Sequence, residues 1–169
     1  MMRQTILAVA VMLGLAAAPV FAADEAWVMK IAKASMAEVE LGKLAAEKGS
    51  SDAVKQFGQR MVDDHSKAND ELKTLAQSKK ITLPTEIAGE EKALRDRLMK
   101  LSGPAFDQAY VKAMVNDHLK AVSEFRTESR SGTDPEVKAW AAKTLPTLEE
   151  HLKMARDANG AVGTSGTKK

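Results

Sequence analysis

The sequence predicts an all-α protein, and three observations support this prediction. Alanine, leucine, lysine and glutamate are abundant while aromatic residues make up only 4% of the chain, a composition that favours helices. Apolar residues recur every three or four positions through four long segments, as on the buried face of a helix. No segment has the alternating pattern of a strand. Because the connections are short, the expected architecture is an antiparallel four-helix bundle with one extra short helix in the crossover.

The first 22 residues have the features of a secretory signal peptide. Arg3 gives a short positive start, residues 6–18 form an apolar run, and small residues up to Ala22 precede the expected cleavage site. The apolar run is too short to span a bilayer comfortably, and no later segment could do so. We therefore expect an exported, periplasmic protein, associated with the outer membrane through a peripheral partner at most, whose helical domain covers residues 23–158.

The first long helix is expected over residues 26–48 and the second over residues 53–78. Gly49 is suited to end the first helix, and Ser51 is suited to cap the second. In both segments the inward positions are spaced by three and four residues. These positions are Trp27, Ile31, Ala34, Glu38, Leu41 and Ala45 in the first helix, and Val54, Phe57, Met61, His65, Ala68, Leu72 and Leu75 in the second.

A short helix and a third long helix follow a break in this pattern. Pro84 disfavours helical geometry at the residue before it, so the short helix is expected over residues 86–101. Pro104 is suited to the first turn of the next long helix, which is expected to end near Arg130.

The last helix is expected to begin after Asp134, which stands directly before Pro135. Pro146 lies inside this helix and should kink it locally, because proline has no backbone N–H. Residues 159–169 are small and polar, and this composition predicts a disordered tail.

Two stretches of the chain nearly repeat each other: MVDDHSKANDEL, which contains His65, and MVNDHLKAVSEF, which contains His118. The chain has only three histidines, and the third, His151, also follows an acidic residue. The repeat suggests two related helical hairpins, with the short helix in the crossover between them.

Four polar residues occupy inward positions near the middle of the four long helices: Glu38, His65, His118 and His151. Helix axes in a bundle are about 8–10 Å apart, so inward side chains at one level can meet. A carboxylate or an imidazole buried alone costs free energy, and this cost is relieved when the groups lie together. We therefore expect one carboxylate and three imidazoles to converge inside the bundle.

Two interpretations of this cluster remain open. As a metal site, Glu38 and the three histidines form a ligand set that zinc, copper or iron accepts. As a structural network, Glu38 accepts hydrogen bonds from the histidines and fixes the register of the helices. Met61 and Met114 each lie one turn before a histidine and are softer candidate ligands, which would favour copper, although filling the core is the simpler role for them.

The acidic residues that directly precede the histidines are Asp64, Asp117 and Glu150. Each points roughly a quarter turn away from the histidine that follows it. An acidic residue of this kind can orient a histidine of the adjacent helix, but we expect these three to form solvated helix flanks.

Several classes of function are disfavoured by the residues. A di-iron oxidase needs Glu-x-x-His on two helices, and Val62, Val115 and Leu148 occupy the positions where those carboxylates would stand. The chain has no cysteine nucleophile and no glycine-rich phosphate loop. A formal net charge of +2, without massed lysine or arginine, gives no electrostatic footprint for nucleic acid.

A redox or hydrolytic enzyme is a third hypothesis, and it requires an open cavity beside the histidines. A core sealed by Tyr110, Phe125 and Trp140 would argue against it. We therefore expect a binding or stress-related protein of the cell envelope rather than a turnover enzyme.

Three segments carry a resemblance to a known family: MAEVELGKLAAEKGSSDAVKQFGQRMVDDHSKANDEL, FDQAYVKAMVNDHLKA and LPTLEEHLKMA. They resemble the bacterial domain-of-unknown-function family 4142, and the likeness extends over about residues 24–159. Members of that family are exported and often labelled outer membrane proteins. The resemblance implies a ferritin-like helical bundle, and it supplies no activity, substrate or cofactor.

Overall fold

The computed structural model describes residues 22–165, and these form five helices and no strand. The helices are α1 (Ala22–Lys48), α2 (Asp52–Ser78), α3 (Glu90–Met99), α4 (Gly103–Ser131) and α5 (Pro135–Ser165). The predicted signal peptide, apart from Ala22, and residues 166–169 lie outside the described residues. The predicted all-α bundle with a short helix in the crossover is confirmed.

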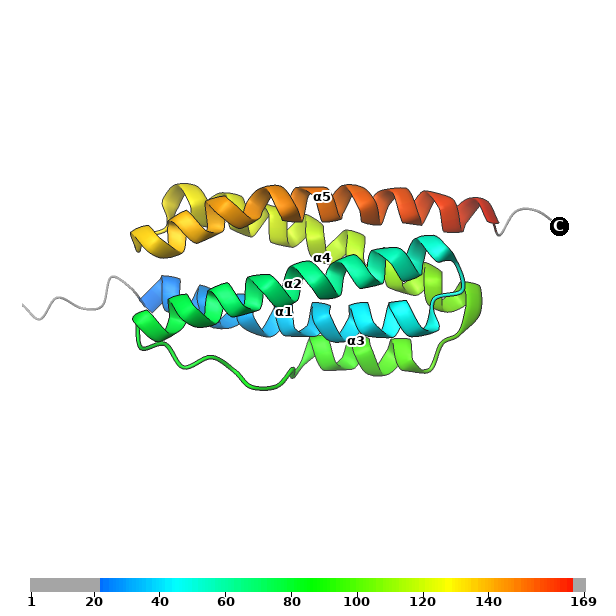
Figure 1. Ribbon diagram of the computed structural model, residues 1–169, viewed down its shortest axis with the longest axis horizontal. Helices are drawn as coiled ribbons and strands as arrows, with labels where there is room; N and C mark the ends of the chain where they lie inside the picture. The colour runs from blue at the N-terminus through cyan, green and yellow to red at the C-terminus, as the bar shows by residue number, and fades with distance from the viewer. Residues whose placement is uncertain (1–21, 166–169) are drawn as a thin grey trace, which may run out of the picture.

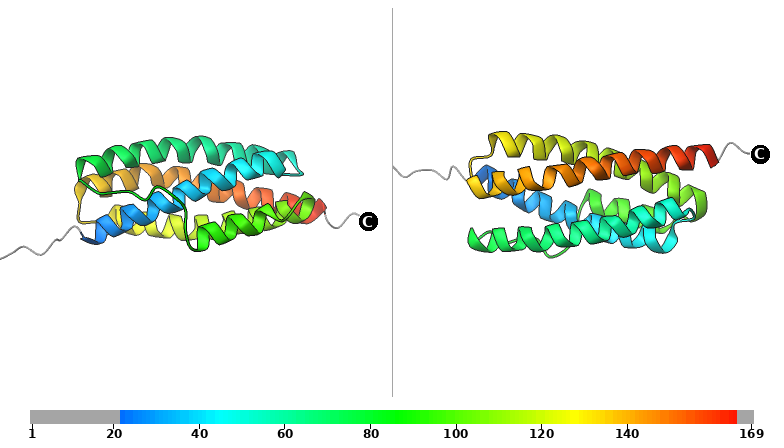
Figure 2. Two further views of the ribbon diagram at one scale, coloured as in Figure 1. Left: turned by 90° about the horizontal axis from the view of Figure 1, so that it is seen from below. Right: turned by 45° about the horizontal axis from the view of Figure 1, so that its top comes forward.

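Two helical hairpins make up the bundle (Figure 1). α1 packs along α2, α4 packs along α5, and α2 also contacts α5. Between the hairpins the chain returns along the length of the bundle through a loop and α3, which lies beside α1. As a result α2 and α4 run in the same direction, while the two helices of each hairpin are antiparallel (Figures 1 and 2). A single long crossover of this kind is the connection found in ferritin-like folds.

The helix ends follow the capping signals of the sequence. The Ser51 hydroxyl accepts a hydrogen bond from the Val54 amide at the start of α2. At the start of α5, the Asp134 carboxylate accepts hydrogen bonds from the amides of Glu136 and Val137. α3 starts at residue 90, four residues later than expected, because the residue before it is a glycine with φ of 66°, a left-handed conformation outside the helix.

α5 continues further than the sequence predicts. Pro146 lies inside this helix without ending it, and the helix runs on through residues 159–165, where the composition predicts a disordered tail. Ala158 is buried and Val162 packs against the apolar core, so the last turns of α5 still cover apolar surface. The contact of Val162 with the core favours helix in this segment despite its small residues.

The repeated stretches lie on α2 and α4, which hold different places in their hairpins. α2 is the second helix of the first hairpin, whereas α4 is the first helix of the second. The two hairpins with α3 between them agree with the prediction, but the repeat does not align the first hairpin with the second. It reflects a shared inward face, since its matched members are buried in pairs: Met61 and Met114, His65 and His118, Leu72 and Phe125.

The apolar core is divided into two clusters. The tryptophan cluster contains Phe125 and Trp140, and Trp27 packs against them with its ring centroid 4.9 Å from that of Phe125. The tyrosine cluster contains Phe57, Phe106, Tyr110, Met61 and Met114. Within residues 22–165, no helix combines the length and the hydropathy that a membrane-spanning helix requires.

One buried aspartate ties each hairpin loop to the other hairpin. Asp107, at the start of α4, accepts hydrogen bonds from the amide and hydroxyl of Ser50 and from the amide of Ser51 in the α1–α2 loop. Asp24, at the start of α1, accepts hydrogen bonds from the amide and hydroxyl of Thr133 and from the next amide in the α4–α5 loop. Each end of the bundle is thereby closed by a carboxylate and backbone N–H groups.

α1 and α2 approach each other closely where two glycines face one another. A Cβ atom added to Gly42 would lie 2.7 Å from the Gly58 carbonyl oxygen, and one added to Gly58 would lie 2.7 Å from the Gly42 carbonyl oxygen. No side chain fits between the two backbones at this point, so the first hairpin depends on glycine at both positions.

Candidate metal centre

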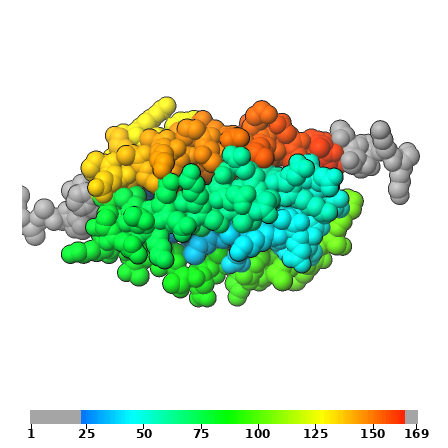
Figure 3. All heavy atoms as spheres, in the orientation of Figure 1, coloured from blue at the N-terminus to red at the C-terminus, as the bar shows by residue number. Residues whose placement is uncertain are grey.

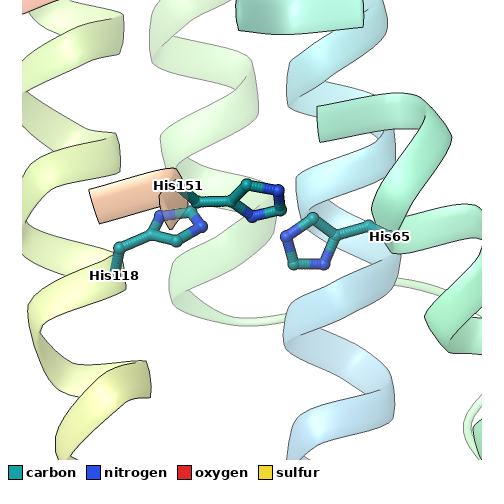
Figure 4. A group of neighbouring side chains, drawn as sticks. All are labelled: His65, His118 and His151. Carbon is teal, nitrogen blue, oxygen red and sulfur yellow. The ribbon is translucent and has the colours of Figure 1, made fainter. Parts of the chain in front are cut away.

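Three imidazoles from three helices meet in the middle of the bundle (Figure 4). His65 comes from α2, His118 from α4 and His151 from α5, and all three are buried. Their ring centroids are 5.3–5.9 Å apart. One nitrogen can be chosen from each ring so that all three lie within 4.8 Å of one another.

Each of the three rings has one nitrogen hydrogen-bonded to a neighbour and one buried nitrogen with no hydrogen-bond partner among the described residues. The bonded nitrogens are His65 Nδ1 with Ser35 Oγ at 3.0 Å, His118 Nδ1 with the Met114 carbonyl at 2.9 Å, and His151 Nε2 with the Asp64 carboxylate at 2.8 Å. The unpartnered nitrogens are His65 Nε2, His118 Nε2 and His151 Nδ1. One nitrogen of each ring faces the space between the rings (Figure 4).

The bonding partners fix the tautomers of two histidines. A backbone carbonyl can only accept, so His118 donates Nδ1–H to Met114 and carries its lone pair on Nε2. The carboxylate of Asp64 likewise accepts Nε2–H from His151, which leaves the lone pair on Nδ1. The Ser35 hydroxyl can donate to His65 or accept from it, so this contact is compatible with a lone pair on Nε2. Outer partners of this kind commonly orient metal-binding imidazoles.

Burial keeps the three imidazoles neutral. It lowers the pKa of His118 to about 4, with a further contribution from repulsion by His151. Burial also lowers the pKa of His65 well below its ordinary value, and repulsion from the other two histidines adds to the effect. The pKa of His151 is lowered by burial despite the opposing effect of Asp64. At neutral pH the rings therefore present lone pairs, the form in which histidine binds a metal.

One nitrogen of each ring can be chosen so that the three are spaced almost as closely as the ligands of a metal ion. Three atoms no more than 4.8 Å apart lie within about 2.8 Å of a common point, whereas a zinc–imidazole bond is about 2.0–2.1 Å. An ion at this point would require each ring to move inward by less than about 1 Å. Side-chain rotations of this size need no change in the helices.

Glu38 lies in the wall of the same cavity as the histidines but does not join them. Within the described part of the chain, the group of potential ligands with atoms inside 4.8 Å consists of the three histidines alone. Burial raises the pKa of Glu38 to about 8, and repulsion from Asp117 adds to the shift, so the carboxyl is largely protonated at neutral pH. Its Oε2 is buried and has no hydrogen-bond partner among the described residues.

The expected hydrogen bonds from the histidines to Glu38 are therefore wrong in this structure. The histidine nitrogens that are bonded use Ser35, Met114 and Asp64 instead. Ser35 lies one turn before Glu38 on α1, and this spacing was the available signal, because positions three apart share a helix face. Serine is common on the inward faces of helices. The sequence alone does not show whether such a serine binds a histidine or only occupies space in the core.

Asp64 is the second correction. The sequence interpretation favours a solvated flank for this residue, but its carboxylate reaches across from α2 to His151 on α5 and also pairs with Arg60. Burial acts to raise the pKa of Asp64, but the hydrogen bonds from His151 and Arg60 outweigh it and hold the pKa below its ordinary value. Asp64 is therefore ionised beside the cluster. α2 and α5 lie side by side, which makes this reach possible (Figure 3).

Met61 and Met114 lie one helical turn from His65 and His118 and are fully buried. Both belong to the tyrosine cluster, where they pack with aromatic rings such as Phe57. This environment agrees with a role in filling the core.

A cavity of about 750 Å³ opens beside the histidines. Its polar wall includes Ser35, Glu38, Asp64, His65, His118 and His151. Exposed residues of α1, α3 and α4 also line it, among them Lys30, Arg97 and Lys120, so the mouth lies on the side where these three helices meet. The core is thus open beside the histidines rather than sealed by aromatic side chains.

Comparison with known proteins identifies the family. A family model for the domain of unknown function DUF4142 matches residues 11–158. The chain belongs to the DUF4142 family. This confirms the resemblance found in the sequence, and it places the three histidines and Glu38 inside the matched region of a DUF4142 protein. No curated protein matches the chain.

Two solved structures resemble this DUF4142 chain. A DUF305 fragment from Deinococcus radiodurans has a TM-score of 0.71 at 14% identity, covering 87% of this chain and 97% of that one. CopM in the Cu(I)-bound form has a TM-score of 0.66 at 14% identity, covering 79% of this chain and 93% of that one. At this identity the likeness shows a shared helical fold and no more.

Proposed function

We propose that this DUF4142 protein binds one transition-metal ion through His65 Nε2, His118 Nε2 and His151 Nδ1. The proposal rests on one observation about the three imidazole rings. In each ring one nitrogen is hydrogen-bonded to a neighbouring group, while the other is buried and has no partner among the described residues. Three lone pairs that face one another repel in a medium of low dielectric constant. A bound cation converts that repulsion into attraction.

Copper is the ion we propose. Neutral imidazoles suit copper, zinc, iron and nickel, so the ligands alone do not choose between them. The structural likeness to CopM in its Cu(I)-bound form supports copper for this fold. Among residues 22–165 no carboxylate joins the close group of ligand atoms, which supports a single ion rather than two. The biological role that we propose is metal binding in the cell envelope, connected with metal stress.

The experiment uses the chain without an affinity tag, purified under conditions that allow loading with Cu(I), Cu(II) or Zn(II). We expect one copper per chain, measured by elemental analysis after removal of free metal. His118→Ala should lose at least nine-tenths of the bound copper, while Met114→Leu, a change of similar volume one turn away, should keep it. Protein that loads no transition metal at neutral pH would leave the histidines as a structural network and overturn the proposal.

The envelope location is a separate proposal that rests on the signal-like residues 1–22. Cells that produce the full chain should release it with the periplasmic fraction, and sequencing of the released protein should begin at Ala23 or one residue later. Full-length protein that remains in the cytoplasmic fraction would contradict this location.

A further inference from the structure

The cavity beside the histidines is much larger than a metal ion requires. Its volume of about 750 Å³ falls in the range of small-molecule sites, about 300–1,000 Å³, whereas a single water takes about 30 Å³. Apolar side chains form much of its wall, including Ile31, Leu41, Leu94 and Leu148. The cavity therefore offers apolar contact to a molecule that extends from the histidines toward the mouth between α1, α3 and α4.

Three histidines leave a tetrahedral ion with one open position. Zinc and copper commonly take four ligands, and a site with three protein ligands leaves the fourth position for a water molecule or another small ligand. Glu38 lies outside the group of close ligand atoms, although it lines the same cavity. The cavity gives an external ligand access to the fourth position.

Charge favours an anion at this position when the ion is divalent. Three neutral imidazoles leave the full charge of the ion uncompensated, and a buried charge is costly unless it is paired. Asp64 is already paired with Arg60, so its charge does not offset that of the ion. An anion at the open position supplies the missing negative charge. Cu(I) carries one positive charge fewer, so it has less need of an anion.

Two polar groups in the wall are suited to the acceptor atoms of such an anion. Glu38 is protonated at neutral pH and its carboxyl can donate a hydrogen bond, and its Oε2 has no partner in the described chain. Trp140 lines the cavity with a buried Nε1–H that likewise lacks an acceptor among the described residues. A carboxylate accepts hydrogen bonds through both of its oxygens, whereas a cationic or purely apolar ligand does not.

We propose that the cavity binds a small monocarboxylic acid whose carboxylate takes the open position on a divalent ion held by the three histidines, and whose apolar body lies along α1, α3 and α4. This inference rests on the proposed function, since it requires a metal at the histidines. The two can fail separately, because metal content is measured before any carboxylate is added.

The test uses protein loaded with Cu(II), with azide as a probe of the open position and benzoate as a probe of the cavity. We expect azide to produce a charge-transfer absorption band and benzoate to abolish it by competition. Reduction to Cu(I) should weaken benzoate binding at least tenfold, measured by calorimetry. A Cu(II)-loaded protein that binds neither probe would overturn the inference while leaving the metal site intact.

A variant that fills the cavity separates the fourth position from the cavity itself. Ala34 of α1 and Ala121 of α4 line the cavity and belong to none of the ligand or hydrogen-bonding groups described above. Ala34→Phe should weaken benzoate binding at least tenfold and azide binding less than threefold, with copper content unchanged. Ala121→Phe provides the same test from the opposite wall if the first variant does not fold. Ala139→Phe, on an exposed face of α5, is the control and should change neither. Equal benzoate binding in all folded variants would overturn the inference.

Discussion

The two hairpins of the bundle have the same contacts at their loops but differ in their interiors. Asp107 lies as far after Asp24 in the chain as Thr133 lies after Ser50, so these are corresponding positions of the two hairpins. In both hairpins the aspartate at the start of the first helix binds the loop of the other hairpin. The α1–α2 hairpin and the α4–α5 hairpin are therefore equivalent at the level of the fold.

Inside the bundle this equivalence is lost. At the same offset along the chain, Gly42 and Gly58 of the first hairpin correspond to Phe125 and Ala141 of the second. Two glycines let the backbones of α1 and α2 touch at this level, whereas the second hairpin has a buried phenylalanine and a buried alanine at the corresponding positions. The two hairpins also contribute different residues to the site. Both helices of the second hairpin supply a histidine, whereas in the first hairpin α2 supplies His65 and α1 supplies Ser35 and Glu38. Two hairpins that are equivalent in their loops thus hold a site that is not symmetric.

The largest effect is expected from Gly58→Ala, which tests the closeness of the first hairpin. The added Cβ would lie 2.7–2.8 Å from backbone and Cβ atoms of α1, so the helices must separate. We expect a loss of about 3 kcal/mol in the free energy of unfolding, measured by chemical denaturation. The matched change in the second hairpin, Ala141→Gly, should cost only about 1 kcal/mol. Equal effects would show that the hairpins do not differ in this way.

The equivalence of the two ends is tested by Asp107→Ala and Asp24→Ala. Each change removes a carboxylate that accepts several hydrogen bonds from partly buried backbone N–H groups, and we expect a loss of about 2 kcal/mol from either. Because the two aspartates lie at opposite ends of the bundle, the double variant should show the sum of the two losses. A large effect from one aspartate and none from the other would break the comparison.

Glu38 has no acidic counterpart in the second hairpin, and its pKa gives a pH dependence to the metal-free protein. Its folded pKa, about 8, lies above the ordinary value of 4.5, so stability from this group is complete at low pH and is lost as pH rises toward 8. The histidines act in the opposite sense, because their lowered pKa values make acid below about 6.5 favour unfolding.

Stability should therefore be greatest near pH 6.5, and it should fall by up to about 2 kcal/mol between pH 6.5 and pH 8. A series of thermal melts across this range measures both sides of the maximum. Glu38→Gln should remove the fall above pH 6.5 and make the rise of stability between pH 4.5 and pH 6.5 steeper, because Glu38 opposes that rise in the unchanged protein. A fall above pH 6.5 that persists in this variant would assign it to another group.

A smaller effect is expected from Asp64→Ala, which removes the partner that orients His151. Copper affinity should fall about tenfold, equivalent to about 1.4 kcal/mol, since outer partners of metal ligands commonly contribute this much or more. Asp63→Ala is the control, because Asp63 is exposed and binds Gln59 on its own helix. Competition with a chelator of known affinity measures both variants, and equal losses would count against the His151–Asp64 contact.

The helices and the histidine cluster were predictable because both follow from the spacing of inward-facing residues along each helix. His65, His118 and His151 interrupt apolar stripes near the middle of their helices, and helices of a bundle meet at those stripes. The partners of the rings were not predictable. Whether His65 meets Ser35 or Glu38 depends on rotamers and on the offset between α1 and α2, and the reach of Asp64 to His151 depends on which flanks lie side by side.

The cavity could not be predicted from the sequence either, for a different reason. Its wall is formed by side chains from all five helices, so its volume depends on how far apart these helices lie. The close contact of α1 and α2 at Gly42 and Gly58 is a second feature of this kind. In the sequence these glycines look like ordinary weak points of helices. Only the distances between backbones show that they let two helices touch.

His118 and His151 are held in opposite tautomers, and this difference has a spectroscopic consequence. Nitrogen-15 NMR spectra of the metal-free protein should show the two rings protonated at different positions. Nδ1 should be protonated in His118 and Nε2 in His151. Upon addition of a diamagnetic ion, the nitrogens that shift should be Nε2 of the former and Nδ1 of the latter. Each ring would thus report its own bond to the ion as a separate resonance.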